Sequence, residues 1–230
     1  MQIEISGIII EVTQKDIINM HLRIKPDGSV HLSAPREYSL EQISRFAHSK
    51  LNWIKKHLSR LEKQGFAKVM TYTSGEELML FGEKYVLSVV EGSRYSLLIS
   101  GQTAVLTAPK SSDTEHKRRF VNEWYRERLR EKIAYFMPKW EQLTGLYSSS
   151  WQIKNMNTYW GTCNTRTKKI WFNLKLALVP ERCLWYVILH ELAHLKERNH
   201  GPRFESILER HMPDWRDVCK KLNEYSNMYR

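Results

Sequence analysis

The sequence predicts an α+β fold. We expect a β-rich N-terminal part with one long helix, and then a backing helix, a small sheet, a His-Glu-x-x-His helix and C-terminal helices. Three observations predict it. Apolar and polar residues alternate at the N-terminus, as in half-buried strands. Apolar residues recur every three or four positions in two long stretches, as in amphipathic helices. The motif at residues 190–194 lies in a further helical stretch.

The first 63 residues are expected to form strands and then a helix. Residues 3–12 are a β-branched run, and strands at 20–25 and 30–34 flank a turn at 26–29. A helix is expected from residue 39 to about residue 63, because apolar side chains recur at helical spacing. They are Leu40, Ile43, Ala47, Leu51, Ile54, Leu58 and Leu61.

Strand signals return between residues 70 and 107, with turns expected at Gly75, Gly82, Gly92 and Gly101. The segment Leu106-Thr107-Ala108-Pro109 echoes Leu32-Ser33-Ala34-Pro35. In both cases a helix is expected next, with a phenylalanine eleven residues after the proline. This echo is a weak indication of a repeated strand–strand–helix unit.

The second half begins with a long amphipathic helix expected over residues 113–143, which Pro138 should kink or end. Strands are expected at 151–156 and 169–174, separated by a turn-rich segment at 158–167. The motif helix is expected over 181–198, and two further helices over 202–210 and 214–225. We place the domain boundary near Ser111-Ser112-Asp113, which gives domains 1–112 and 113–230.

Composition narrows the class of protein. The 230 residues suffice for a hydrophobic core, and no apolar run approaches the roughly 20 residues of a membrane span. The N-terminus lacks the pattern of a signal peptide. The three cysteines are far apart, which argues against a disulfide framework and a four-cysteine zinc site. Reduced thiols indicate a cytoplasmic protein. The missing apolar run predicts that a membrane is not a partner.

The formal net charge is +11, which fits a nucleic-acid or other acidic partner. The basic residues are widely spread, however, and many alternate with glutamates at helical spacing, as at Glu123, Arg126, Glu127 and Arg130. A solvated helix face explains that pattern at least as well. Nucleic-acid association therefore stays open as an alternative.

The most informative stretch is His190-Glu191-Leu192-Ala193-His194. Two histidines four residues apart share one face of a helix, and both imidazoles can reach a single Zn²⁺ ion at about 2.0–2.1 Å. Glu191 is not a ligand in this geometry. It lies where a carboxylate can take a proton from metal-bound water. The motif predicts a catalytic zinc site.

A third ligand is expected at His200, ten positions after His190. Asn199 and Pro202 mark a helix end and a restart, so the chain can bring His200 to the metal from another direction. Glu197 competes for this role from the same helix face as His190. Three ligands from one helix stripe surround an ion poorly, so we prefer His200. The fourth position is then left for water, as in catalytic zinc sites.

The order of elements resembles a minimal zincin, in which an edge strand beside the cleft receives an extended substrate. Four segments resemble the YgjP-like metal-dependent hydrolase family, which is grouped with SprT-like and WLM metallopeptidases. They are Tyr159-Trp160-Gly161-Thr162-Cys163, Ile170-Trp171-Phe172-Asn173-Leu174, His190-Glu191-Leu192-Ala193-His194-Leu195 and Asn199-His200-Gly201-Pro202-Arg203-Phe204. The resemblance covers most of the chain and is specific over residues 151–204.

The resemblance implies that His190, His194 and His200 bind zinc, that Glu191 is the catalytic base, and that the segment Trp160-Gly161-x-Cys163 borders the cleft. Trp160 and Cys163 fit packing beneath the motif helix equally well, and Cys163 as a fourth ligand is disfavoured. The histidine spacing also equals that of metzincins, but Glu197 stands where they have glycine. Further cleft residues are expected among Tyr159, Gly161, Asn173 and Arg203.

The resulting hypothesis is a zinc-dependent metallopeptidase, in which one Zn²⁺ ion and Glu191 activate water against a peptide bond. Its partner would be a protein or peptide substrate. The oxyanion could be stabilised by Tyr159, Arg166, Asn173, Arg203 or His211. Two alternatives remain: a nucleic-acid-associated protein, such as a DNA-linked protease, and a catalytically idle domain that zinc stabilises.

Overall fold

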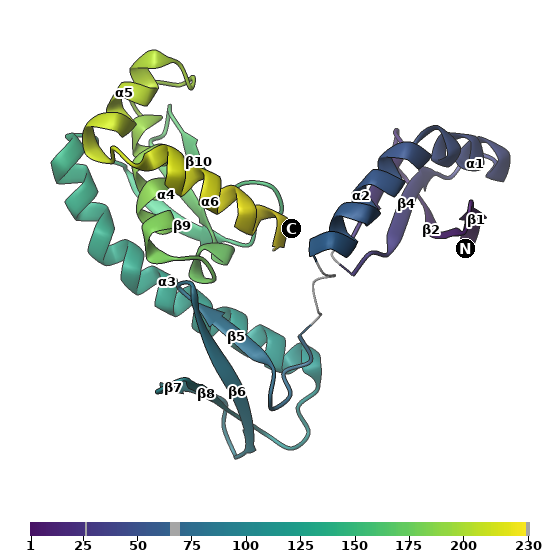
Figure 1. Cartoon of the computed structure of the whole chain (residues 1–230), viewed down its shortest axis with the longest axis horizontal. Helices are drawn as coiled ribbons and strands as arrows, with labels where there is room; N and C mark the ends of the chain where they lie inside the picture. Colours follow the sequence, from purple (N-terminus) through teal and green to yellow (C-terminus); the bar gives the residue numbers. More distant parts are fainter. Residues whose placement is uncertain (26, 65–69, 229–230) are drawn as a thin grey trace. The chain divides into compact units, whose positions relative to one another are not determined.

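The structure is a computed structural model that describes residues 1–25, 27–64 and 70–228. The chain forms two compact units, Met1–Val69 and Met70–Asn227 (Figure 1). Pro26 of the expected turn and the side chain of Leu61 lie outside the described residues. The chain is α+β, as the sequence predicts.

The first unit contains a four-stranded sheet in the order β1-β2-β4-β3. Its strands are β1 (Gln2–Ile5), β2 (Ile8–Lys15), β3 (His21–Ile24) and β4 (Val30–Pro35). The central pair β2 and β4 is parallel, and both outer pairs are antiparallel. The β-branched run at 3–12 thus forms strands as predicted, but two of them. Ser6 and Gly7 both have positive φ, and this turn folds the run into a hairpin.

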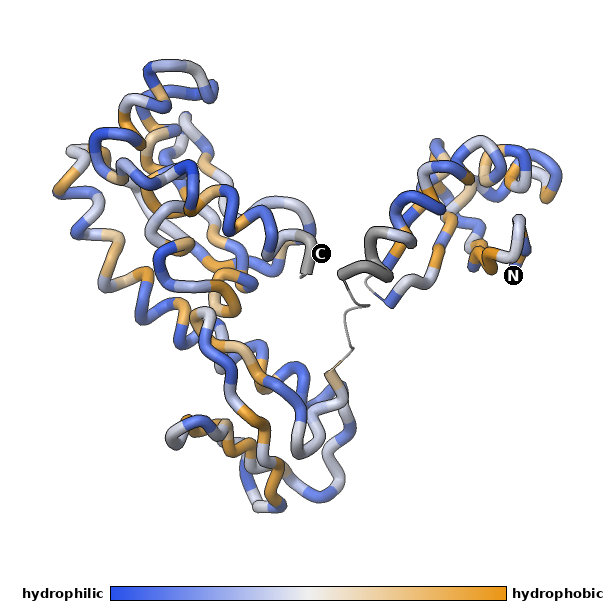
Figure 2. The backbone as a smooth tube through the Cα atoms, in the orientation of Figure 1, coloured by the Kyte–Doolittle hydropathy of each residue, from blue (hydrophilic) through white to orange (hydrophobic). Residues whose placement is uncertain are grey.

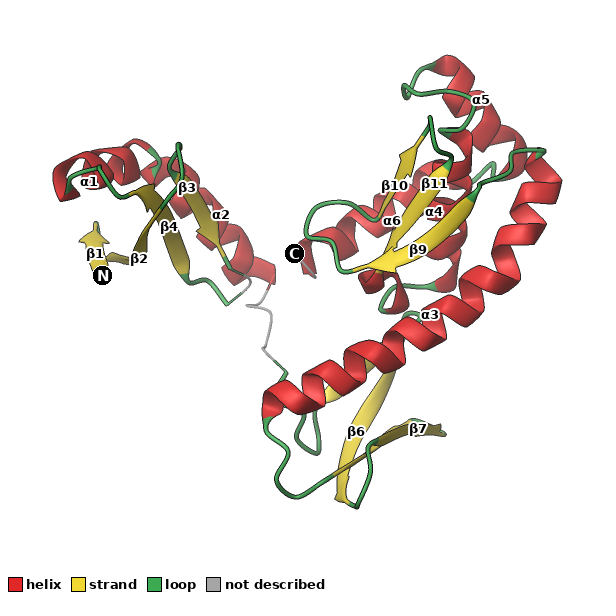
Figure 3. Cartoon of the chain, turned by 180° about the vertical axis from the view of Figure 1, so that it is seen from behind, coloured by secondary structure: helices red, strands yellow, loops and turns green. Residues whose placement is uncertain are grey.

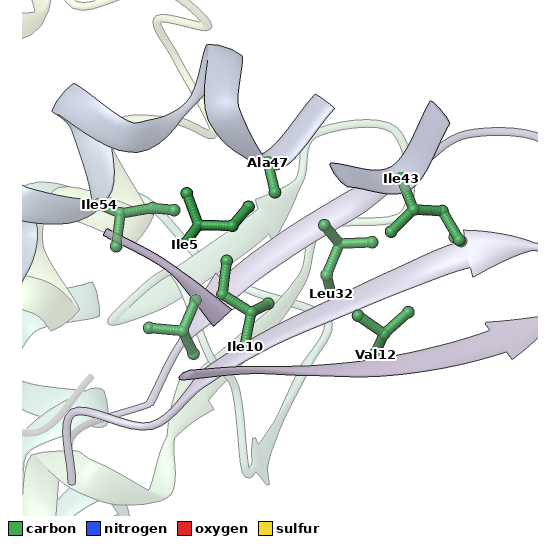
Figure 4. Close-up of a cluster of buried hydrophobic side chains, with 9 residues drawn as sticks. Ile5, Ile10, Val12, Leu32, Ile43, Ala47 and Ile54 are labelled. Atoms are coloured by element: carbon green, nitrogen blue, oxygen red, sulfur yellow. The ribbon is translucent and has the colours of Figure 1, made fainter. Parts of the chain in front are cut away.

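Two helices cover one face of this sheet, α1 (Leu40–Ser49) and α2 (Leu51–Gln64). Ser39 and Gln42 form a capping box at the start of α1. The single helix predicted over 39–63 is interrupted at Lys50, the C-cap of α1. Both pieces keep the predicted apolar stripe, because Ile43, Ala47 and Ile54 are buried against Ile10 and Leu32 of the sheet (Figure 4).

The second unit opens with another four-stranded sheet, in the order β5-β6-β8-β7. Its strands are β5 (Glu77–Leu80), β6 (Glu83–Glu91), β7 (Ser96–Ser100) and β8 (Thr103–Ala108). The central pair is again parallel and the outer pairs are antiparallel, as in the first sheet. The repeat indicated by the two Leu-x-Ala-Pro segments is thus confirmed, with four strands in each copy rather than two.

The long helix α3 (Thr114–Thr144) connects this sheet to the rest of the second unit (Figure 3). Hydrophobic and hydrophilic residues succeed one another along it (Figure 2). Asp113 caps its N-terminus, and Gly145, with φ of 68°, ends it. Pro138 does not end the helix, which continues through it to Thr144. The predicted span of 113–143 is thus nearly correct.

A three-stranded sheet follows, in the order β10-β11-β9, with β9 (Ser150–Lys154), β10 (Gly161–Asn164) and β11 (Lys169–Asn173). The turn-rich segment predicted at 158–167 is therefore wrong in part, because it contains the edge strand β10. This strand is hard to recognise in the sequence because it contains polar residues, which an edge strand tolerates since it needs only one buried face. A 3₁₀ turn, η1 (Leu174–Ala177), leads on to the motif helix.

The last three helices are α4 (Glu181–Ala193), α5 (Pro202–His211) and α6 (Trp215–Met228). The motif helix α4 is shorter than the predicted 181–198, because tight turns follow Ala193. The N–H groups of Leu195 and Lys196 donate to the carbonyls of Leu192 and Ala193. Within the described residues, no helix is both long and apolar enough to cross a membrane.

The predicted boundary at residue 112 lies inside the second unit, between β8 and α3. Hydrogen bonds connect residues that precede position 112 with residues that follow it. The Tyr125 hydroxyl donates to the Met79 carbonyl over 2.6 Å, and the Phe81 N–H donates to the Ala177 carbonyl over 2.7 Å. We treat residues 70–227 as one unit, and a domain boundary at residue 112 stays a prediction.

Candidate metal centre

Helix α4 places the first two histidines. It starts after Pro180, buries an apolar face that includes Leu184, Val187 and Ile188, and reaches His194 as its C-cap. His190 and His194 therefore lie one turn apart on the same side, with ring centroids 4.8 Å from each other. The helix is fixed in the core, so the positions of both imidazoles are fixed with it.

The irregular segment after α4 brings His200 to the same place. Its ring centroid lies 5.0 Å from that of His190 and 4.8 Å from that of His194. One ligand atom from each of the three rings lies within 4.8 Å of the others. Neither the Glu197 carboxylate nor the Cys163 thiol belongs to this cluster. The structure thus brings together the three histidines that the sequence singled out.

Two of the ring nitrogens lie at a separation that fits a shared metal ion. Nε2 of His190 lies 3.1 Å from Nε2 of His200. Tetrahedral ligands bound at about 2.0–2.1 Å would be separated by about 3.3 Å. Nδ1 of His190 lies 3.3 Å from the Tyr186 hydroxyl, and Nδ1 of His194 lies 3.2 Å from the Glu197 carbonyl. These outer partners orient the rings and leave Nε2 for an ion.

Phe204 forms the floor beneath the three imidazoles. It is only 2% exposed, and its ring centroid lies 4.9 Å from that of His190 and 4.8 Å from those of His194 and His200. It is the third residue of α5, so the restart at Pro202 brings it there. An apolar floor lowers the local dielectric and holds the rings in place.

The surroundings keep the imidazoles neutral, the form that binds metals. Burial, and then the neighbouring His194 and His200, lower the pKa of His190 to about 3. Burial also lowers the pKa of His194, with a further contribution from His200. A neutral imidazole offers a lone pair, whereas an imidazolium does not. The donor set therefore fits a metal ion.

Glu191 is buried beside the cluster and is 4% exposed. Burial raises the pKa of its carboxyl to about 8, and its Oε2 atom is buried without a hydrogen-bond partner. An unpaired buried carboxyl is costly, and it is explained when a cation or a substrate proton lies next to it. The structure therefore separates Glu191 from ordinary core residues.

The backbone of Gly161, the first residue of β10, approaches Glu191 very closely. A Cβ atom at this position would lie 2.6 Å from Oε1 of Glu191 and 2.8 Å from its Cγ. Any other residue here would displace the carboxyl. Gly161 therefore belongs to the site because it leaves room for Glu191.

A cavity of about 600 Å³ opens at this point. Its lining consists of Tyr159, Gly161, Thr162, Cys163, Asn164, Thr165, Arg166, His190, Glu191, His194, Arg198 and His200. Three of the expected cleft residues thus line it, namely Tyr159, Gly161 and Cys163. Burial raises the pKa of the Cys163 thiol to about 11, with a smaller contribution from Glu191, so this cysteine stays protonated.

Three other expected cleft residues, Trp160, Asn173 and Arg203, are not among the lining residues. Asn173 is 3% exposed and its amide donates to the carbonyls of Met156 and Tyr159, over 2.8 and 2.7 Å. It therefore holds the loop that leads to β10. The Trp160 indole N–H donates to the Ser226 hydroxyl of α6 over 2.7 Å, so Trp160 anchors the same loop.

Sequence reasoning gave no cleft role to Thr162, Asn164, Thr165 and Arg198, and considered Arg166 only for the oxyanion. A signal existed for Arg198, because it lies between the second and third histidines and must stay near the metal. The positions of the other residues at the cavity depend on the edge strand β10 and its turn, which are not recognisable in this polar sequence.

Comparison with known protein families matches residues 18–225 to the YgjP-like metallopeptidase domain. Two solved structures are similar over part of the chain. The metallopeptidase zymogen jannalysin of Methanocaldococcus jannaschii is 25% identical, with a TM-score of 0.37, over 40% of this chain and 95% of that chain. The zymogen abylysin of Pyrococcus abyssi is 17% identical, with a TM-score of 0.37, over 39% and 90%. None of the curated proteins compared with the chain matches it significantly.

Proposed function

Because the chain belongs to the YgjP-like metallopeptidase family, and is therefore a metal-dependent peptidase, we propose that zinc is its metal and Glu191 its general base. His190, His194 and His200 would hold the ion. One observation carries the proposal: three imidazoles converge beside a buried carboxyl at the wall of an open cavity.

The donor set favours zinc over magnesium or calcium. Imidazole nitrogen suits zinc, copper, iron and nickel, whereas magnesium and calcium prefer oxygen ligands. Three protein ligands also leave one coordination position open, which distinguishes catalytic from structural zinc sites. Neither Cys163 nor Glu197 has an atom in the cluster. An open position is therefore consistent with the described residues.

When bound, zinc would supply a Lewis acid that acidifies a water and polarises the scissile carbonyl. Glu191 would take the proton from the attacking water and deliver it to the amine of the leaving fragment. Burial alone would keep this carboxyl largely protonated at neutral pH, since its pKa is about 8. A neighbouring dication favours the carboxylate and so prepares it to act as a base.

The edge strand β10 would bind the peptide. One side of β10 pairs with β11, and its first residue, Gly161, lies against Glu191. An extended peptide added along the other side would bring a backbone carbonyl close to the base. Asn173 and Trp160 would act as positioning residues, since they hold the loop before β10.

The direct test combines metal analysis of the purified chain with a peptide-cleavage screen. We expect about one zinc per chain and cleavage of unstructured peptides. Glu191→Gln should keep the zinc and lower kcat by about 10²–10⁴-fold. His200→Ala should lose most of the zinc, whereas His116→Ala, on an exposed histidine outside the cluster, should keep it. Unchanged zinc in His200→Ala, or full turnover in Glu191→Gln, would overturn the proposal.

Gly161→Ala tests the position of the base without removing it. The added Cβ should push the Glu191 carboxyl aside and reduce kcat more than tenfold, while zinc content stays unchanged. Gly201→Ala is the matched control, because nothing lies within 4 Å of a Cβ built there. Equal activity in the two variants would mean that the close approach at Gly161 has no part in catalysis.

A further inference from the structure

The charged groups in the cavity are unevenly distributed. Among the described residues that line it, Arg166 and Arg198 carry the positive charges and Glu191 is the one acidic residue. Glu191 is buried next to the histidines, whereas both arginines are exposed at the rim. A substrate in the cavity therefore has access to two exposed guanidinium groups near the metal site.

Neither guanidinium is paired in the part of the chain that the structure describes. Several other arginines of the second unit form ion pairs. On α3, Arg118 and Arg126 form ion pairs with Glu115 and Glu123, and Arg216 of α6 bridges Glu205 and Glu209. An unpaired guanidinium with its planar fork of donors is suited to a carboxylate from a ligand.

The hairpin turn after β10 fixes the place of Arg166. The side chain of Asn164 accepts hydrogen bonds from the N–H groups of Arg166 and Thr167, over 3.1 and 3.0 Å. Gly161 lies next to Glu191, and Asn164 is three residues further along the strand. With a strand rise of about 3.3 Å per residue, Asn164 is about 10 Å from the base along the peptide path.

Arg198 lines the same cavity from another part of the chain, the segment that joins His194 to His200. The wall of β10 and its turn thus supplies one arginine, and the wall after α4 supplies the other. A peptide extended along β10 would lie beside the turn that carries Arg166, in the cavity that Arg198 also lines. A side chain two or three residues from the scissile bond would lie at the level of Asn164 and of the turn that carries Arg166.

We propose that the cavity selects carboxylate-bearing peptides, and that Arg166 and Arg198 are the specificity-determining residues that bind an acidic group two or three residues from the scissile bond. The inference rests on the proposed peptidase function of the same site. The carboxylate can belong to an aspartate or glutamate side chain or to the C-terminus of a short peptide. Both sources present the same chemistry to a guanidinium.

The experiment uses the full-length, zinc-loaded protein and matched sets of short N-acetylated peptides. One set is C-amidated and carries Asp or Glu, or else Asn or Gln, at each position near the cleaved bond. A neutral set differs in having a free C-terminal carboxylate. We expect kcat/KM to be about fivefold higher for each well-placed carboxylate, and the preference to shrink as salt is added.

The variants Arg166→Gln and Arg198→Gln should each reduce this preference, and the double variant should abolish it. Arg94→Gln is the matched control, because Arg94 is exposed, unpaired among the described residues and outside the cavity lining. It removes the same charge and should leave the preference unchanged. A preference that survives in the double variant, or falls equally in Arg94→Gln, would refute the assignment.

Binding of the same peptides to the Glu191→Gln variant separates this inference from the proposed function. Tighter binding of the carboxylate peptides, lost in the triple variant with Arg166→Gln and Arg198→Gln, supports the inference even if the wild type cleaves nothing. In that case the peptidase proposal fails alone. Cleavage of peptides without any carboxylate preference in rate or binding overturns the inference and leaves the peptidase proposal standing.

Discussion

The two four-stranded sheets have the same topology but contact different parts of the chain. Each has a central parallel pair flanked by antiparallel strands, and each ends in a Leu-x-Ala-Pro segment. Leu32 pairs with both Val12 and Leu22, and Leu106 pairs in the same way with Val89 and Leu97. The first hairpin of each sheet turns through two residues of positive φ, at Ser6-Gly7 and at Phe81-Gly82.

The copies differ in how far this hairpin extends. When the two sheets are aligned on their central parallel pairs, Ile10 corresponds to Leu87. Ile10 follows Gly7 by three positions, whereas Leu87 follows Gly82 by five. The longer hairpin reaches the start of α4. The Phe81 N–H donates to the Ala177 carbonyl, and Gly82 packs against Pro180, the N-cap of α4. The hairpin of the second sheet, which is two residues longer, therefore supports the motif helix.

The largest effect that tests this comparison is expected from Gly82→Ala. The new Cβ would lie 2.7 Å from Cγ of Pro180 and 3.0 Å from its backbone, at a φ of +87°. Left-handed strain and overpacking together should lower the stability of the second unit by about 2–4 kcal/mol. Thermal unfolding and zinc content measure the result, because a displaced α4 also loosens the histidine cluster.

The same substitution in the other copy provides the control. Gly7 has a φ of +78°, but nothing lies within 4 Å of a Cβ built on it. Gly7→Ala should therefore cost only the backbone strain of about 1 kcal/mol, and zinc content should not change. If the two variants behave alike, the contact with Pro180 does not support α4.

A smaller, pH-dependent effect on stability is expected at Glu76. Its backbone pairs with that of Leu87, and the corresponding pair in the first sheet is Ile3 and Ile10. Burial raises the pKa of Glu76, but hydrogen bonds from Thr71 and Thr73 outweigh it and hold the pKa below its usual value of 4.5. The stabilisation is therefore fully present above about pH 4.5 and is lost as pH falls through the lowered pKa.

Glu76→Gln should cost about 1–3 kcal/mol at pH 7, since a carboxylate accepts these bonds better than an amide. The cost should vanish in acid, where the wild-type carboxyl is protonated. Urea unfolding at several pH values measures both. A cost that stays constant from pH 7 to pH 3 would show that the charge of Glu76 contributes nothing.

The histidine cluster could be predicted from sequence because its determinants are local. The i, i+4 spacing of His190 and His194 is set by one helix, and Pro202 marks the start of the next helix just after His200. The helix end was placed too late, because α4 ends at Ala193 and not near Asn199. The helix break at Lys50 and the strand β10 could not be predicted. Neither has a distinctive local pattern, and tertiary pairing with β11 determines the edge strand.

The cleft residues were predicted less well for a related reason. Asn173 carries a polar side chain in a motif segment, but its amide is used to hold the loop carbonyls of Met156 and Tyr159. Residue type alone does not distinguish a polar group that faces a substrate from one that satisfies the backbone. The wall position of Arg198 likewise depends on where the turns after Ala193 direct the chain.

A still smaller effect is expected where α3 meets the second sheet. The Tyr125 hydroxyl donates to the Met79 carbonyl in a partly buried position over 2.6 Å. Tyr125→Phe leaves the ring in place and should cost about 1 kcal/mol in the free energy of unfolding. Tyr135→Phe is a suitable control, because Tyr135 is 59% exposed on the same helix. Equal costs would mean that this bond does not help to attach the sheet.

The smallest effect is expected from removing residues 1–69. The histidines, Glu191, Phe204 and the cavity lining all belong to the second unit, and so does the hairpin that supports α4. Zinc content and kcat/KM for a neutral peptide should therefore equal those of the full chain. Removing residues 1–112 should abolish zinc binding, because it takes away Phe81 and Gly82 as well. If both truncations keep zinc, neither sheet supports the site, and if both lose it, the first unit is required as well. Different outcomes would locate the support in the longer hairpin alone.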